Sequence, residues 1–157
     1  MARLYGWSPR GERSIASIPH GHWKTLTLVM GLRHDGAIAP WIVDGAMTGE
    51  AFRVYIESIL CPELKAGDIV ICDNLACHHV AGVREAIERK GAFLRHLPPY
   101  SPDLNPIENA FAKIKSVLRK LGKRTVDALL ESVLPALESL SKDDCTGFFR
   151  HANYATH

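Results

Sequence analysis

The order of apolar patterns between residues 23 and 97 constrains the fold more than any other feature of the sequence. Two apolar, β-branched runs at 23–32 and 38–43 flank a short turn, which predicts an antiparallel hairpin. Helical and strand-like patterns then alternate, in the order helix at 48–61, strand at 68–73, helix at 80–90 and strand at 92–97. This order predicts a mixed α/β sheet with helices on its faces.

Prolines divide the remainder of the chain. Three of them lie within 98–103 and exclude regular structure there. Asn105 is a candidate N-cap ahead of Pro106, so a helix is predicted to begin at that point and continue to Leu121. A last amphipathic helix is predicted over 125–140, bent or interrupted at its proline, and a brief strand is predicted near 14–18.

Composition sets the broad class of protein. The 157 residues suit one domain, and 46% hydrophobic with 23% charged residues excludes a disordered chain or a disulfide-rich miniprotein. A net charge of +2 makes any nucleic-acid partner a question of where the charges lie. The sequence has no long apolar run and no signal-peptide pattern, and its four cysteines form no CxxC pair. We therefore expect a cytoplasmic protein with reduced thiols and no membrane contact.

Asp73 is the first candidate for chemistry. It closes the apolar run 68–73, at the end of a predicted strand where open α/β sheets bind their ligands. No Lys or Arg stands beside it, and an unbalanced carboxylate is costly to bury. A bound hard divalent metal ion would balance the negative charge and offset that cost. An ordinary turn formed by Asp73 and Asn74 is the alternative, and the residues leave both interpretations open.

Glu108 is the second candidate. It lies in the first turn of the predicted helix, three residues after Asn105, where its side chain could complete a capping box. The joint pattern favours a functional role over the capping box. A strand that ends in an acid is followed by a second strand, a rigid loop and then an acid at the start of a helix. Such a scaffold can hold two carboxylates together, as metal-assisted phosphoryl transfer requires.

Two segments carry a family resemblance. The runs ICDNLACHH at 71–79 and LPPYSPDLNPIENAFAKIK at 97–115 resemble the endonuclease core of DDE-superfamily transposases, in the mariner-like bacterial insertion-sequence group. Thirty-four residues separate Asp73 from Glu108, the spacing for which that group is named. GWSPRG at 6–11 and FFRHANY at 148–154 also match. The resemblance implies a ribonuclease-H-like α/β fold and one endonuclease domain over residues 1–157, without a helix-turn-helix domain.

The resemblance further implies a two-metal site, in which three carboxylates bind two Mg²⁺ or Mn²⁺. By position, Asp73 would be the second acid and Glu108 the third. The family's first acid lies on the first, central strand, upstream of the segment that 3–11 matches. We therefore expect this chain to lack both that strand and that acid, and to be catalytically impaired on its own.

None of the seven acids before Asp73 stands where the family has its first acid. Each is better interpreted as a solvated residue, including Asp68, which opens the strand at the end remote from Asp73. The neighbours of the absent strand would also carry unpaired backbone groups.

Several further residues have more than one interpretation. His78 matches the family's histidine after Asp-Asn, so it either contacts DNA phosphate or metal-bound water, or packs within the loop. Asn74 either orients Asp73 or contacts DNA, or is a turn residue. Zinc bound by the cysteines and histidines of 72–79 is disfavoured, because their spacing matches no standard zinc motif.

Basic residues gather after Glu108, where Lys113, Lys115 and Arg119 begin a run that continues to Arg124. A lysine-rich helix is usually a solvated face. Beside a metal site it is also a candidate track for the phosphate backbone. We predict DNA contacts by Lys113, Lys115 and Arg119, together with Asn74 and His78.

The sequence thus predicts a fragment of a DNA transposase catalytic domain. Intact relatives cut DNA at the ends of the element and join the 3′ ends to target DNA. DNA is the expected partner, and a homodimer is a candidate assembly. A non-catalytic relic, a DNA-binding or dimerising regulator of full-length transposase, and one half of a frameshift-split enzyme stay open as alternatives, because the first acid is not found.

Overall fold

The computed structural model describes residues 7–13, 15, 25–123 and 125–154. Its elements are β1 (Leu26–Arg33), β2 (Gly36–Asp44), α1 (Gly49–Tyr55), β3 (Ile69–Cys72), α2 (Val83–Glu88), β4 (Phe93–His96), α3 (Pro106–Leu121), α4 (Val126–Glu138) and α5 (Lys142–His151). The mixed α/β class predicted from the sequence is confirmed. The strand predicted near 14–18 lies outside the described residues, apart from Ile15. Across the described part of the chain, no helix is long and apolar enough to cross a lipid bilayer.

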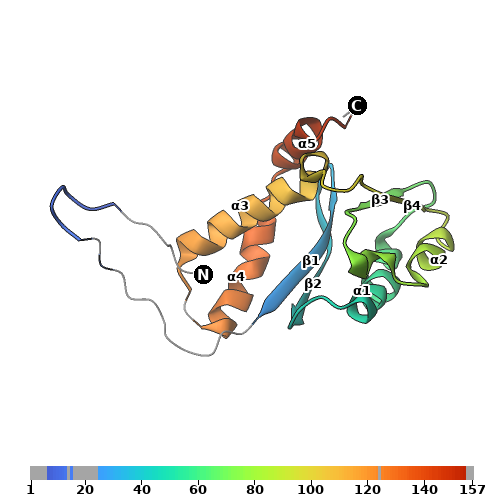
Figure 1. The fold of residues 1–157 in the computed structure, drawn as a ribbon, viewed down its shortest axis with the longest axis horizontal. Coiled ribbons are helices and arrows are strands. Elements are labelled where there is room, and N and C mark those ends of the chain that lie inside the picture. The colour runs from blue at the N-terminus through green and yellow to red at the C-terminus, as the bar shows by residue number, and fades with distance from the viewer. Residues whose placement is uncertain (1–6, 14, 16–24, 124, 155–157) are drawn as a thin grey trace.

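The predicted hairpin is the middle layer of the molecule (Figure 1). β1 and β2 pair antiparallel from Leu26 opposite Asp44 to Arg33 opposite Gly36. Side chains of a strand point alternately to its two faces. Met30 packs with the buried face of α3, α4 and α5, whereas its neighbours on the other face of the hairpin pack toward α1 and α2. The hairpin therefore contributes to both hydrophobic cores.

β3 and β4 form the second pair, which is parallel and runs from Ile69 opposite Phe93 to Cys72 opposite His96. One face of this pair packs with the core under α1 and α2. The opposite face is open to solvent, with Ile69 62%, Ile71 38% and Phe93 50% exposed. Helices α3 to α5 pack on the β1–β2 hairpin (Figure 1).

The helices differ from the prediction at several places. α2 begins at Val83 because Gly82 adopts φ +92°, which a right-handed helix does not allow. α4 runs through Pro135 without interruption. α5 was not predicted, although Ser141 and Asp144 form a reciprocal capping box that the sequence spacing could have signalled.

An ion pair joins the two strand pairs at one end. Arg33 closes β1, and its two terminal nitrogens donate to the carboxylate of Asp68 at 2.5 and 3.3 Å. The Arg33 hydrogen bonds, aided by the backbone N–H of Lys65, lower the pKa of Asp68. The expectation that Asp68 is a solvated residue is therefore wrong, because its carboxylate fixes the start of β3 to the end of β1.

Candidate active site

Asp73 and Glu108 line the same cavity. The cavity has a volume of about 840 Å³ and lies between β1 and β3. Asp73 directly follows β3, and Glu108 stands in the first turn of α3. Two acids that are distant in sequence are thus brought to one hollow by a strand end and a helix start.

Local contacts fix the carboxylate of Asp73. Its Oδ1 accepts a hydrogen bond from the backbone N–H of Leu75 at 3.1 Å, which is the turn geometry that the sequence left open. The same oxygen lies 2.7 Å from Nδ1 of His78. Among the described residues, Oδ2 has no partner. The carboxylate therefore makes the turn and also keeps one oxygen available to a ligand.

The neighbours of Asp73 form a compact polar cluster. The ring of His78 packs on Phe52 at 4.3 Å between ring centroids. The Nε2 of His79 donates to Oδ1 of Asn74 at 2.6 Å. His96 at the end of β4 stacks on His79 at 4.1 Å. Phe52 and His96 were not predicted at the site, because only the fold brings α1 and β4 to this loop.

Glu108 is placed by the proline-rich loop that precedes it. The N-cap Asn105 makes no side-chain hydrogen bond, and the capping box considered from the sequence does not form. The loop is held from the other end of the chain, where the Tyr154 hydroxyl donates to the carbonyl of Leu104 at 3.1 Å. Within the described residues the Glu108 carboxylate has no hydrogen bond or ion pair, so it is available to a ligand.

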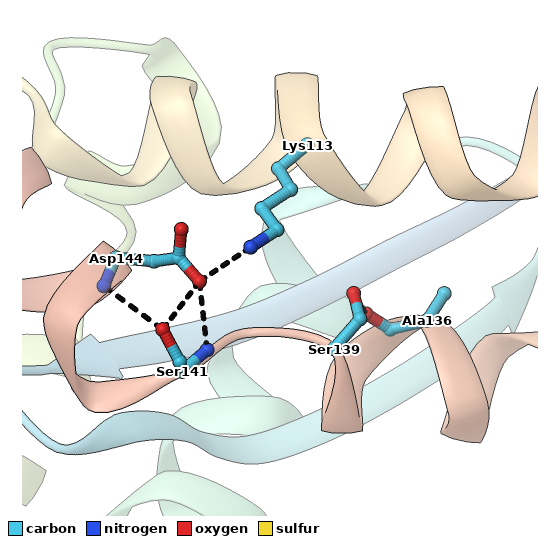
Figure 2. A network of polar contacts seen from close by, with 5 residues as sticks. All are labelled: Lys113, Ala136, Ser139, Ser141 and Asp144. Atoms are coloured by element: carbon cyan, nitrogen blue, oxygen red, sulfur yellow. Dashed lines mark hydrogen bonds and ion pairs between the residues drawn. The ribbon is translucent and has the colours of Figure 1, made fainter.

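The three predicted DNA-contacting residues of α3 lie on different sides of the helix. Lys113 forms an ion pair with Asp144, whose carboxylate also accepts from Ser141 (Figure 2). These bonds, the one from Lys113 first, lower the pKa of Asp144 to about 2. Lys115 and Arg119 are exposed and follow Glu108 by about two and three helical turns, so they continue its face of α3.

The chemistry of the two acids fits a hard divalent cation. Mg²⁺ is commonly bound through one or two carboxylates, with water and substrate phosphate completing its shell. The described residues contain no group of three His, Cys, Asp or Glu side chains that could hold a metal ion. Burial raises the pKa of Cys72 to about 12, which keeps this thiol protonated at neutral pH. A metal ion bound by Asp73 and Glu108 would therefore need further ligands other than the described His, Cys, Asp and Glu side chains, such as water or substrate phosphate.

The comparisons with known proteins decide the family. Residues 1–129 match the sequence profile of the DDE superfamily endonucleases. The chain belongs to the DDE superfamily endonuclease family. No curated protein matches the sequence.

Solved structures show the fold of this DDE endonuclease chain. A pre-cleavage Mos1 transpososome is similar with a TM-score of 0.70 at 14% identity, over 96% of this chain and 47% of that chain. The catalytic domain of Mos1 mariner transposase is similar with a TM-score of 0.63 at 13% identity, over 83% and 74% of the two chains. The ribonuclease-H-like fold predicted from the sequence is confirmed, and the chain spans about half the length of the transposase in the first complex.

Proposed function

We propose that this chain is the catalytic core of a DNA transposase, with Asp73 and Glu108 as metal-binding catalytic acids. The observation that carries the proposal is that both carboxylates line one cavity and each keeps free ligand atoms. Family membership and fold agree with this chemistry. Similar Mos1 catalytic-domain structures are described with Mg and with Mn, which supports a divalent ion as cofactor.

Each residue of the proposed site has a distinct task. Asp73 would be a metal ligand, held in one orientation by Leu75 and His78. Glu108 would be the second ligand, presented by a loop that Tyr154 restrains. Divalent ions held by Asp73 and Glu108 would supply Lewis-acid chemistry, that is, activation of the attacking water or 3′-hydroxyl and stabilisation of the leaving oxygen.

DNA is the proposed substrate. Lys115 and Arg119 would contact the phosphate backbone, because they extend the exposed face of α3 that begins with Glu108. A duplex lying along that face would place a phosphate near the two acids. Asn74 and His78 would border the same path, whereas Lys113 would contribute less because Asp144 already neutralises it. Mos1 relatives solved as transposon-end complexes support DNA as the partner.

A non-catalytic role is the second candidate. The observation that favours it is the absence, among the described residues, of a third acid grouped with Asp73 and Glu108. With two acids alone, the chain would bind metal and DNA without completing strand transfer. It would then regulate a full-length transposase, or act as one half of a split enzyme.

A metal titration tests the proposed site directly. Mn²⁺ binding is measured by electron paramagnetic resonance for the wild type, for Asp73→Asn and for Glu108→Gln. We expect each variant to bind at least about tenfold more weakly, a loss of about 1.4 kcal/mol. Glu131→Gln, an exposed acid on α4, is the matched control and should bind as the wild type does. Equal binding by all four proteins would overturn the site.

A plasmid-nicking assay with Mn²⁺ separates the two functions. Nicking that depends on Asp73 and Glu108 supports the enzyme. Metal and DNA binding without nicking supports the regulator or the half enzyme.

A further inference from the structure

The last described residues form a turn that reverses the chain after α5. The segment 148–154 has the sequence FFRHANY and lies beyond the residues that match the DDE endonuclease profile. The N–H of Tyr154 donates to the carbonyl of Phe149 at 2.9 Å, and the N–H of Asn153 donates to the carbonyl of Arg150 at 3.1 Å. These two bonds form a Schellman motif, in which the residue after the helix cap takes a left-handed conformation.

Asn153 supplies that left-handed residue. Its φ is +65°, a value that asparagine adopts more readily than most residues other than glycine. The motif returns the chain onto the helix, where the ring of Tyr154 meets the ring of Phe149 edge-on, with 5.8 Å between their centroids. The conformation of Asn153 therefore decides where the side chain of Tyr154 lies.

Two contacts anchor α5 to the rest of the fold. Asp144 in its first turn forms an ion pair with Lys113 of α3 (Figure 2). Near its last turn, the ring of Phe149 packs on the ring of His34, which lies in the turn between β1 and β2, with 4.1 Å between centroids. The helix and the hairpin turn thus fix the ring against which Tyr154 packs.

Tyr154 connects this anchored turn to the loop before Glu108. Its hydroxyl donates to the carbonyl of Leu104 at 3.1 Å, and burial raises the pKa of Tyr154, which keeps the donor protonated at neutral pH. Leu104 ends a short helical turn, and Asn105 follows it as the N-cap of α3. The N–H of Glu108 donates to the carbonyl of Asn105 at 3.2 Å. A continuous set of contacts therefore runs from the end of α5 to Glu108.

We propose that the segment 148–154 positions Glu108 for metal binding, with Asn153 and Tyr154 as positioning residues. Among the described residues, the Tyr154 hydroxyl makes the one hydrogen bond that joins the loop 98–105 to a segment beyond α3 in the sequence. Tyr154 and Glu108 also line the same cavity. The task of placing a metal ligand rests on the proposed function, whereas the restraint of the loop does not.

Substitution of Asn153 tests the proposal while keeping the Tyr154 hydroxyl. Asn153→Gly retains the left-handed conformation, whereas Asn153→Val strains it, because a β-branched residue is disfavoured at positive φ. Tyr154→Phe removes the donor alone. Gly122→Val is the matched control, because Gly122 caps α3 at φ +60° and lies at the end of that helix remote from Glu108.

Amide hydrogen exchange, measured by NMR without metal, reports the restraint of the loop. The N–H groups of Leu104, Asn105 and Glu108 should exchange at least about fivefold faster in Asn153→Val and in Tyr154→Phe than in the wild type. Asn153→Gly and Gly122→Val should keep the wild-type rates at these three groups. Unchanged exchange in both Asn153→Val and Tyr154→Phe would overturn the inference.

Mn²⁺ affinity, measured by electron paramagnetic resonance, reports the consequence for the site. Asn153→Val and Tyr154→Phe should bind Mn²⁺ about fivefold more weakly than the wild type, whereas Asn153→Gly and Gly122→Val should bind normally. The loss should vanish in a Glu108→Gln background and persist in an Asp73→Asn background, because the segment acts through Glu108. A loss that persists without the Glu108 carboxylate, or an equal loss in Gly122→Val, would overturn the positioning role and indicate general destabilisation.

Failure of the proposed function has a different signature. If Glu108→Gln binds Mn²⁺ as the wild type does, Glu108 is not a ligand, and both the proposed site and its positioning by this segment are wrong. If Glu108→Gln weakens binding whereas Asn153→Val and Tyr154→Phe do not, the proposed site stands and the positioning role alone is overturned.

Discussion

The Nδ1 atom of His78 lies 2.7 Å from Oδ1 of Asp73, in a loop that also packs the histidine ring on Phe52. The ring is 17% exposed, whereas the carboxylate is 35% exposed. His78 is therefore in a position to hold one carboxylate oxygen, and among the described residues the other oxygen has no partner. Partners of this kind orient metal ligands, and their loss typically weakens metal binding by about 10-fold or more.

Replacing His78 tests this positioning role. His78→Phe keeps the aromatic packing on Phe52 and removes the hydrogen bond, so we expect Mn²⁺ affinity to fall by about 10-fold. His78→Asn keeps a donor at a similar distance and should restore part of the affinity. The exposed His151 on α5 supplies the control variant His151→Phe, which should bind metal normally. Unchanged affinity in His78→Phe would show that the contact is only structural.

Lys115 and Arg119 are predicted to bind DNA phosphates through charge. Each phosphate contact adds about 0.9 to the slope of log affinity against log salt concentration. Lys115→Ala and Arg119→Ala should therefore each lower that slope by about 1, with little effect on sequence preference. The measurement is DNA affinity between low and physiological salt.

Lys120 is the control for this prediction, because it is exposed on α3 but lies on a different face from Glu108. Lys120→Ala removes the same charge and should leave the salt dependence unchanged. If Lys120→Ala lowers the slope as much as Lys115→Ala, the binding is non-specific attraction to the whole helix.

The sequence predicted those elements whose signals are local. The helix predicted from residue 48 has Thr48 as its N-cap, and the Thr48 hydroxyl accepts a hydrogen bond from Ala51 N–H at 3.1 Å. Apolar periodicity likewise predicts the hairpin and the alternation of helices and strands around β3. Asp73 and Glu108 were identified from strand-end and helix-start positions together with the family resemblance.

Contacts between distant segments were beyond the sequence. Nothing near Asp68 indicates Arg33, because the ion pair joins two strands 35 residues apart. The sequence around Tyr55 indicates an ordinary core residue of α1, and only the packing shows that its hydroxyl has no hydrogen-bond partner among the described residues. Lys113 carries the same local signal as Lys115, and only the position of α5 distinguishes them.

Tyr55→Phe is predicted to stabilise the chain. The buried hydroxyl has no partner in the described residues, and an unsatisfied buried polar group costs about 1–3 kcal/mol. Its removal should raise the free energy of unfolding by about 1 kcal/mol, measured by urea denaturation. Tyr154→Phe is the matched control, because that hydroxyl donates to Leu104 and its loss should lower stability by about 1 kcal/mol. A loss of stability in Tyr55→Phe would show that the hydroxyl is paired in solution.

Asp144 predicts a specific dependence of stability on pH. Its folded-state pKa of about 2 lies below the ordinary value of 3.8. A carboxyl group with a lowered pKa contributes stability above its ordinary pKa, and that contribution is lost as pH falls through the folded-state pKa. The contribution of Asp144 should therefore be complete at pH 5 and disappear between about pH 4 and pH 2.

Urea unfolding of the wild type and Asp144→Asn at several pH values measures this contribution. The variant should be less stable at pH 5, and the difference should shrink toward pH 2 because the wild-type carboxylate becomes protonated. Lys113→Met removes the largest cause of the lowered pKa and should shift the loss to higher pH. Asp143→Asn, the exposed neighbouring acid, should follow the wild type at every pH. A constant difference between the wild type and Asp144→Asn across this range would mean that the carboxylate acts through shape and hydrogen bonding and not through charge.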